Sequence, residues 1–222
     1  MIKQNLQKLK ENIPTHVSLV AVSKTKPISA IQEAYDAGQR DFGENKIQEM
    51  ASKHEDLPKD IRWHMIGHVQ TNKVKYMASF VHLIHGVDSL KLLKEINKQA
   101  KKHDRVINCL LQARIAVEET KFGMPFSEIK ALLNSDELLE LQNIKIVGLM
   151  GMASFTSDKE QVINEFSLLS KHFKTLKTFN FTNFQLSTLS MGMSADYKLA
   201  IEQGSTMIRV GSAIFGLRNY IS

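Results

Sequence analysis

Short apolar runs alternate with stretches of helical periodicity along the chain, and this alternation is the strongest constraint on its fold. Each run is brief and has polar or turn-forming residues on either side, as strands buried in a parallel sheet do. The runs fall at 17–23, 40–42, 62–66, 81–86, 106–112, 144–149, 184–189 and 206–210. The helical stretches between them fall at 29–38, 44–55, 70–79, 89–102, 126–134, 158–177 and 194–203. The pattern predicts an α/β protein.

Two of the predicted helices carry start signals in the sequence. Ser29 with Gln32, and Ser157 with Glu160, have the spacing of a capping box, in which side chains satisfy the first backbone N–H groups of a helix. In the second of these helices, apolar residues recur every three or four positions, which predicts a stripe packed in the core. The stripe consists of Val162, Phe166, Leu169, Phe173 and Leu176.

Eight strands alternating with helices fit two architectures, a closed (β/α)8 barrel and an open, doubly wound sheet. A doubly wound sheet that binds a dinucleotide would carry a glycine-rich turn after its first strand. That turn here, at 23–27, contains no glycine. We therefore predict a TIM-type (β/α)8 barrel that forms a single domain over residues 1–222, with one extra helix at its N-terminus.

Composition and charge exclude several classes of protein. The chain has 222 residues, of which 43% are hydrophobic, enough for one sizeable core. Its net charge of +6 is spread over amphipathic stretches and forms no concentrated patch, which argues against nucleic-acid binding. The single cysteine, Cys109, lies in an apolar run, where we expect a core role in a reducing compartment. No run is long enough to cross a bilayer, so we expect a cytoplasmic protein without a membrane partner.

Lys24 ends the first apolar run and would therefore lie at the mouth of a barrel, where active groups gather. A lysine that is partly desolvated beside another cation, here Lys26, loses its proton more readily and can condense with an aldehyde. An isolated lysine after a strand is more commonly just solvated. The rest of the chain must decide between these interpretations.

Polar residues also follow the second and third runs. The side chain of Asn45 either hydrogen-bonds a bound polar ring or caps the next helix. His64 and His68 are four residues apart, but the strand context and Gly67 oppose the geometry of a shared metal ion. We predict no metal site, and we expect His64 in the core or in a pocket wall.

The loops after the seventh and eighth runs have the composition of a phosphate site. Small residues whose backbone N–H groups are free at a helix start bind anions well, and barrels commonly hold phosphate after these two strands. Such residues occur at 189–194 and 207–216, where Arg209 precedes Gly211 by two positions and would point into the mouth. Each loop alone also fits an ordinary helix-start turn.

Strands one and eight are neighbours in a closed barrel, so a ligand carrying both an aldehyde and a phosphate would span Lys24 and these loops. Pyridoxal 5′-phosphate has both groups. The chain resembles the pyridoxal-phosphate homeostasis protein family, small single-domain relatives of the N-terminal barrel of alanine racemase. The resemblance extends over essentially the whole chain. Its motifs lie at 21–27, 42–45, 63–73, 189–194 and 208–216.

The resemblance implies that Lys24 forms a Schiff base with pyridoxal phosphate and that Asn45 lies beside the cofactor. By analogy with the racemase barrel it places Arg209 against the pyridine nitrogen, where a fixed cation opposes protonation of the ring. It gives no role to His68. The residues that it implies for the phosphate are Ser190, Gly211 and Ser212, with serine at 212 where threonine is common in the family.

The resemblance further implies a protein without catalytic residues that sequesters pyridoxal phosphate and delivers it, with apo enzymes that use the cofactor as recipients. Alanine racemase completes its acid–base pair with a second, tyrosine-bearing domain, which we expect this chain to lack, and we expect a monomer. Two alternatives stay open. One is a racemase or lyase with Lys24 as its single base, and the other is a phosphate-binding barrel without an imine. We assign no role to Lys121, in a predicted loop over the mouth at 117–124.

Overall fold

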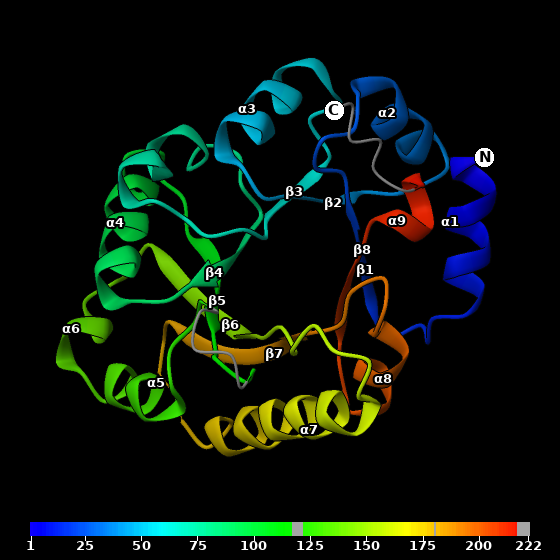
Figure 1. The fold of residues 1–222 in the computed structure, drawn as a ribbon. Helices are drawn as coiled ribbons and strands as arrows, with labels where there is room; N and C mark the ends of the chain where they lie inside the picture. The colour runs from blue at the N-terminus through cyan, green and yellow to red at the C-terminus, as the bar shows by residue number, and fades with distance from the viewer. Residues whose placement is uncertain (117–121, 180, 217–222) are drawn as a thin grey trace.

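The computed structural model describes residues 1–116, 122–179 and 181–216 (Figure 1). Within these residues, parallel strands β1 to β8 pair in chain order and close into a barrel, with the helices in a ring outside it. The strands are β1 (Ser18–Val22), β2 (Asp41–Glu44), β3 (Arg62–Met65), β4 (Leu83–Val87), β5 (Ile107–Gln112), β6 (Ile144–Met150), β7 (Phe184–Ser190) and β8 (Met207–Val210). The predicted TIM-type (β/α)8 barrel is confirmed, and its strand ends differ from the predicted runs by two residues at most.

The extra N-terminal helix is also confirmed. It is α1 (Ile2–Glu11), and it lies against α2 (Ile28–Asp36) and α9 (Ser212–Phe215), where the Asn5 side chain donates a hydrogen bond to the carbonyl of Ile214 at 3.1 Å. Among the described residues, no helix has the length and apolar character that spanning a bilayer demands. The helices are α1 (Ile2–Glu11), α2 (Ile28–Asp36), α3 (Ile47–Asp56), the 3-10 helix η1 (Thr71–Tyr76), α4 (Leu90–Lys101), α5 (Phe126–Leu133), α6 (Asp136–Leu139), α7 (Lys159–Leu176), α8 (Tyr197–Glu202) and α9 (Ser212–Phe215).

Both capping-box predictions were wrong. Helix α2 begins after Pro27, whose fixed φ suits a helix start, and no side chain caps it. Helix α7 is capped by Asp158, whose carboxylate accepts the backbone N–H groups of Glu160 and Gln161 at 2.9 and 3.2 Å. A carboxylate also interacts favourably with the helix dipole, which explains why it takes the cap position from the neighbouring Ser157.

The core has two layers. Between the barrel and the helices lie large buried side chains, including Trp63, Phe42 and the whole predicted stripe of α7. Inside the barrel, a smaller apolar cluster fills part of the space, and charged and polar side chains fill the rest. The apolar cluster consists of Val20, Leu83, Leu110, Met150 and Met207. Because the strands are parallel, their C-terminal ends share one mouth, and the residues that follow them converge there.

Candidate functional site

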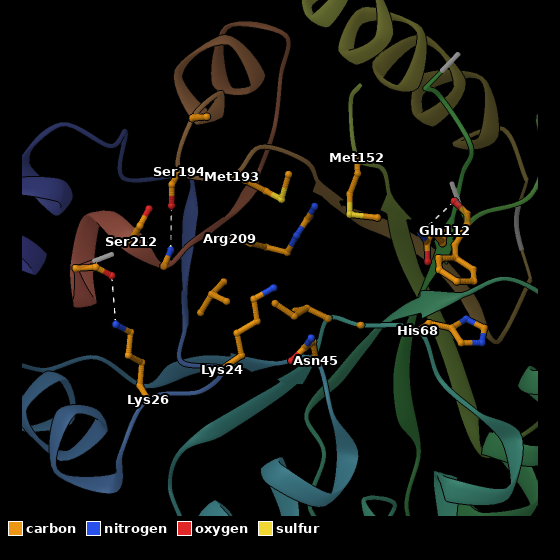
Figure 2. Close-up of a pocket in the computed structure, with 17 residues that line it drawn as sticks. Lys24, Lys26, Asn45, His68, Gln112, Met152, Met193, Ser194, Arg209 and Ser212 are labelled. Carbon is orange, nitrogen blue, oxygen red and sulfur yellow. Dashed lines mark hydrogen bonds between the residues drawn. The ribbon is translucent and has the colours of Figure 1, made fainter. Parts of the chain in front are cut away.

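A cavity of ≈ 410 Å³ opens at this mouth (Figure 2). The volume suits a small ligand, since such sites usually measure about 300–1,000 Å³. The lining includes five of the six predicted cofactor-binding residues. These five are Lys24, Asn45, Arg209, Gly211 and Ser212. The barrel therefore brings together residues that are up to 188 positions apart in the chain.

Lys24 lies in the turn that follows β1 and is half-buried, and its side chain reaches into the cavity beside Asn45, below Arg209 in the view of Figure 2. The next residue, Thr25, has a φ of +65°, a left-handed conformation that is costly for a β-branched side chain. The Glu49 carboxylate holds this turn by accepting the Thr25 backbone N–H at 2.6 Å. The lysine thus projects from a strained but anchored turn.

A buried network of ionic hydrogen bonds contacts Ser23, the residue before Lys24. The ammonium of Lys53 donates to the Ser23 carbonyl at 2.9 Å, to Oε1 of Glu44 at 2.8 Å and to Oε1 of Glu49 at 2.7 Å. The hydroxyl of Ser23 donates to the same Glu44 oxygen at 2.5 Å. Burial raises the pKa of Glu44 above its ordinary value, and the nearby Lys53 charge opposes the shift. These bonds join β2 and α3 to the residue before Lys24.

Asn45 follows β2, and its side chain faces the cavity. The alternative in which it caps the next helix is wrong, because α3 starts after Lys46 and has no side-chain cap. Gly67 explains how this part of the chain fits together. A Cβ atom there would lie 2.5 Å from the Asn45 carbonyl oxygen, so only glycine permits the approach.

The start of α9 forms the opposite wall of the cavity. Gly211 and Ser212 line it, and the hydroxyl of Ser194 accepts the Gly211 backbone N–H at 3.2 Å. Lys26 fixes the other end of α9, because its ammonium donates to the carbonyls of Phe215 and Gly216 at 3.1 and 3.2 Å. Sequence reasoning missed Ser194 and this role of Lys26, although both lie within the motifs at 189–194 and 21–27.

Arg209 forms part of the cavity floor and is 4% exposed. Its Nη1 donates to Oγ of Ser190 at 2.6 Å, and its Nη2 donates to the carbonyl of Gly151 at 3.2 Å. Burial lowers the pKa of Arg209 to about 10, and the charge of Asp196 opposes that shift. Ser190 itself is fully buried beneath Arg209 and is not part of the lining. The structure therefore places Ser190 under the site and Ser194 at its surface.

Comparison with known proteins assigns the family. The model of the alanine racemase N-terminal domain family matches residues 1–219. The pyridoxal phosphate homeostasis protein of Vibrio alginolyticus is 39% identical, over 99% of this chain and 98% of the relative. The chain belongs to the pyridoxal phosphate homeostasis protein family. A second homeostasis protein, from Aquifex aeolicus, is 40% identical over 91% of this chain and 87% of its own length.

A solved structure of the same family resembles the barrel closely. PipY of Synechococcus elongatus PCC7942, solved with PLP bound, is 36% identical to this chain. The match covers 97% of this chain and 100% of PipY, with a TM-score of 0.87. The similarity therefore extends over the complete barrel and includes the strands that surround the cavity.

The remaining predicted residues are also placed. His64 is buried inside the barrel, which confirms a core position, and Cys109 is buried where burial raises the pKa of its thiol. His68 lines the cavity, and its ring stacks on Phe122 with centroids 4.5 Å apart. Within the described ranges, no group of three or more potential ligands could hold a metal ion. Lys121 lies outside the described residues.

Proposed function

We propose that this chain binds pyridoxal 5′-phosphate as a Schiff base on Lys24 and takes part in intracellular pyridoxal-phosphate homeostasis by sequestering and delivering the cofactor. One observation carries the proposal. The amine of Lys24 and the backbone of Gly211 and Ser212 line the same cavity, so an aldehyde and a phosphate can be held together. The names of the relatives and the PLP bound to PipY support this interpretation.

The lining residues fit the chemistry of this cofactor. The start of α9 offers the backbone N–H of Ser212 to a phosphate, and the Ser194 hydroxyl, which accepts the Gly211 N–H, lies at the same wall of the cavity. Asn45 would offer its amide to the cofactor, and the buried cation of Arg209 would oppose protonation of a ring nitrogen. When bound, the cofactor would supply an aldehyde for the Lys24 amine and an electron-withdrawing ring. A direct phosphate contact from Ser190 stays a prediction.

Absorption spectroscopy tests the proposal. Wild-type protein, Lys24→Ala and Lys26→Met are incubated with pyridoxal phosphate, desalted and scanned for a visible imine band. We expect the band in wild type and in Lys26→Met, a control that removes the second of the two lysines that line the cavity among the described residues. Borohydride reduction followed by peptide mass spectrometry should place the adduct on Lys24. A spectrum without any band would favour a plain phosphate site.

We propose further that the protein is not an enzyme, that apo enzymes receive the cofactor from it and that it is a monomer. The names of the relatives support the first point, because they describe homeostasis and not a reaction. The test incubates loaded protein with a panel of amino acids in D2O. Exchange of any α-proton at an enzymatic rate would establish a racemase or lyase instead.

A further inference from the structure

A chain of hydrogen bonds crosses the barrel interior from the cavity floor to the opposite mouth. Nη1 of Arg209 lies 2.6 Å from Oγ of Ser190, and that hydroxyl lies 3.1 Å from Nδ1 of His85. Nε2 of His85 lies 3.0 Å from Nδ1 of His64, and Nε2 of His64 lies 3.0 Å from Oδ1 of Asp41. The five side chains come from β8, β7, β4, β3 and β2.

This arrangement is unusual for a barrel interior. TIM barrels are normally filled by apolar side chains, many of them branched. Part of this barrel follows that rule, with the cluster of Val20, Leu83, Leu110, Met150 and Met207. Ser190 and His85 are fully buried and His64 is 1% exposed, so each would be costly if any of its polar atoms lacked a partner. The hydrogen bonds satisfy both ring nitrogens of each histidine.

The two ends of this hydrogen-bond chain fix the direction of its two outer bonds. Asp41 is ionised and can only accept, because hydrogen bonds from Arg62 and His64 outweigh burial and hold its pKa below the usual range. His64 therefore donates from Nε2 to Asp41. At the other end Arg209 can only donate, which makes Ser190 the acceptor of that bond.

His85 connects the two ends of the hydrogen-bond chain. Burial lowers the pKa of His85 well below its ordinary value, so the ring is neutral and carries one proton. Ser190 accepts from Arg209, so its own hydroxyl proton is donated to its other partner, Nδ1 of His85. The single proton of His85 therefore lies on Nε2 and is donated to Nδ1 of His64. A proton on Nδ1 of His85 instead would leave the buried hydroxyl proton of Ser190 without an acceptor in this hydrogen-bond chain. Every bond therefore donates in the direction from Arg209 to Asp41.

We propose that His64 and His85 are positioning residues that act through Ser190 to fix the guanidinium of Arg209 at the cavity floor. Ser190 is held as an acceptor in one place, and together with the carbonyl of Gly151 it occupies two of the five N–H groups of Arg209. Arg209 lines the cavity, where its remaining N–H groups can donate to an acceptor on the ligand. This inference rests on the proposed function only in taking that acceptor to be the ring nitrogen of pyridoxal phosphate.

The first experiment examines the hydrogen-bond chain in the ligand-free protein. Long-range ¹⁵N–¹H NMR reports the protonation state of each histidine ring, and His64→Gln and His85→Gln assign the signals. In both rings the proton should lie on Nε2 and Nδ1 should accept. A ring that is charged, or that carries its proton on Nδ1, would overturn the inference whether or not the cofactor binds.

The second experiment compares pyridoxal phosphate with an analogue in which carbon replaces the ring nitrogen. A hydrogen bond from a cation should make wild type prefer the natural cofactor about tenfold or more. His85→Gln moves the polar group away from Ser190 and should bring the ratio of the two affinities close to one. His85→Asn is the matched control, because its amide lies near the Nδ1 position, and it should keep most of the preference.

The outcomes separate the two proposals. An undiminished preference in His85→Gln, with the imine band intact, would refute the positioning role and leave the proposed function standing. Wild type that binds neither compound would refute the proposed function, and the NMR result would then decide alone whether the hydrogen-bond chain exists. Thermal melting of each variant separates a loss of folding from a loss of preference.

Discussion

Replacing Lys53 by Met should destabilise the protein in a pH-dependent way. Met keeps most of the length of the side chain but removes the ammonium that contacts Ser23, Glu44 and Glu49. The side chains of Lys53 and Glu44 are 7% and 0% exposed, so the variant leaves a carboxylate buried without its cation. Breaking such a pair from one side costs about 3–5 kcal/mol.

The loss of stability depends on pH because the buried Glu44 carboxylate can become neutral by taking up a proton. Protonation costs about 1.4 kcal/mol for each pH unit above the pKa of the unfolded state. With an ordinary value of 4.5, this limits the penalty to about 5 kcal/mol at pH 8 and to less than about 1 kcal/mol at pH 5. Because burial already raises the folded pKa of Glu44, its contribution to stability decreases as the pH rises above 4.5, and it should decrease more steeply in Lys53→Met.

The assay is urea unfolding of wild type and variant at pH 5 and pH 8. We expect a loss of about 3–5 kcal/mol at pH 8 and about 1 kcal/mol or less at pH 5. The double variant Glu44→Gln/Lys53→Met should recover most of the loss at pH 8, because the fully buried carboxylate is then removed together with its cation. Glu49→Gln, which removes the more exposed carboxylate, should cost less than about 1 kcal/mol. Equal losses at both pH values would show that packing and not charge accounts for the effect, and the reasoning would then be wrong.

Two further substitutions test other parts of the structure. Gly67→Ala would place a Cβ 2.5 Å from the Asn45 carbonyl oxygen and should lower stability by about 1–3 kcal/mol and reduce imine formation; an unchanged melting temperature would contradict the close approach. Asp41→Asn should be less stable than wild type by about 1–3 kcal/mol at pH 7, because hydrogen bonds to a charged group are lost. Since the pKa of Asp41 is held below its ordinary 3.8, this difference should shrink as the pH falls below 3.8, and acid titrations in which it stays constant would argue against an ionised Asp41.

The strands could be predicted well because a barrel buries both faces of each strand, which produces continuous apolar runs in the sequence. Helix starts depend on one or two side chains and are harder to predict. The sequence pattern favoured Ser157 as the start of the helix at 158–177, but the neighbouring carboxylate of Asp158 makes the cap. Both residue types are good caps, so spacing alone does not choose between them.

Depth within the barrel explains why Ser194 lines the cavity and Ser190 does not. Sequence reasoning could place 189–194 at the mouth but could not tell how far β7 extends toward it. Ser190 is the last residue of that strand and points inward below the cavity, whereas Ser194 lies beyond the strand and reaches the lining. The tilt and stagger of the strands set this depth, and the order of residues in the chain does not record it.

The interior hydrogen-bond chain is even harder to predict from the sequence, because its members meet only when five strands close into one barrel. The structure shows two networks that serve opposite sides of the cavity. Lys53 and Glu44 anchor the turn that carries Lys24, and His85 acts on Arg209. Among the described residues, the two networks have no member in common, and sites without shared partners usually contribute additively. Lys53→Met and His85→Gln should therefore weaken cofactor binding by independent factors that multiply, and a double variant no weaker than the worse single one would show that the two networks act as a unit.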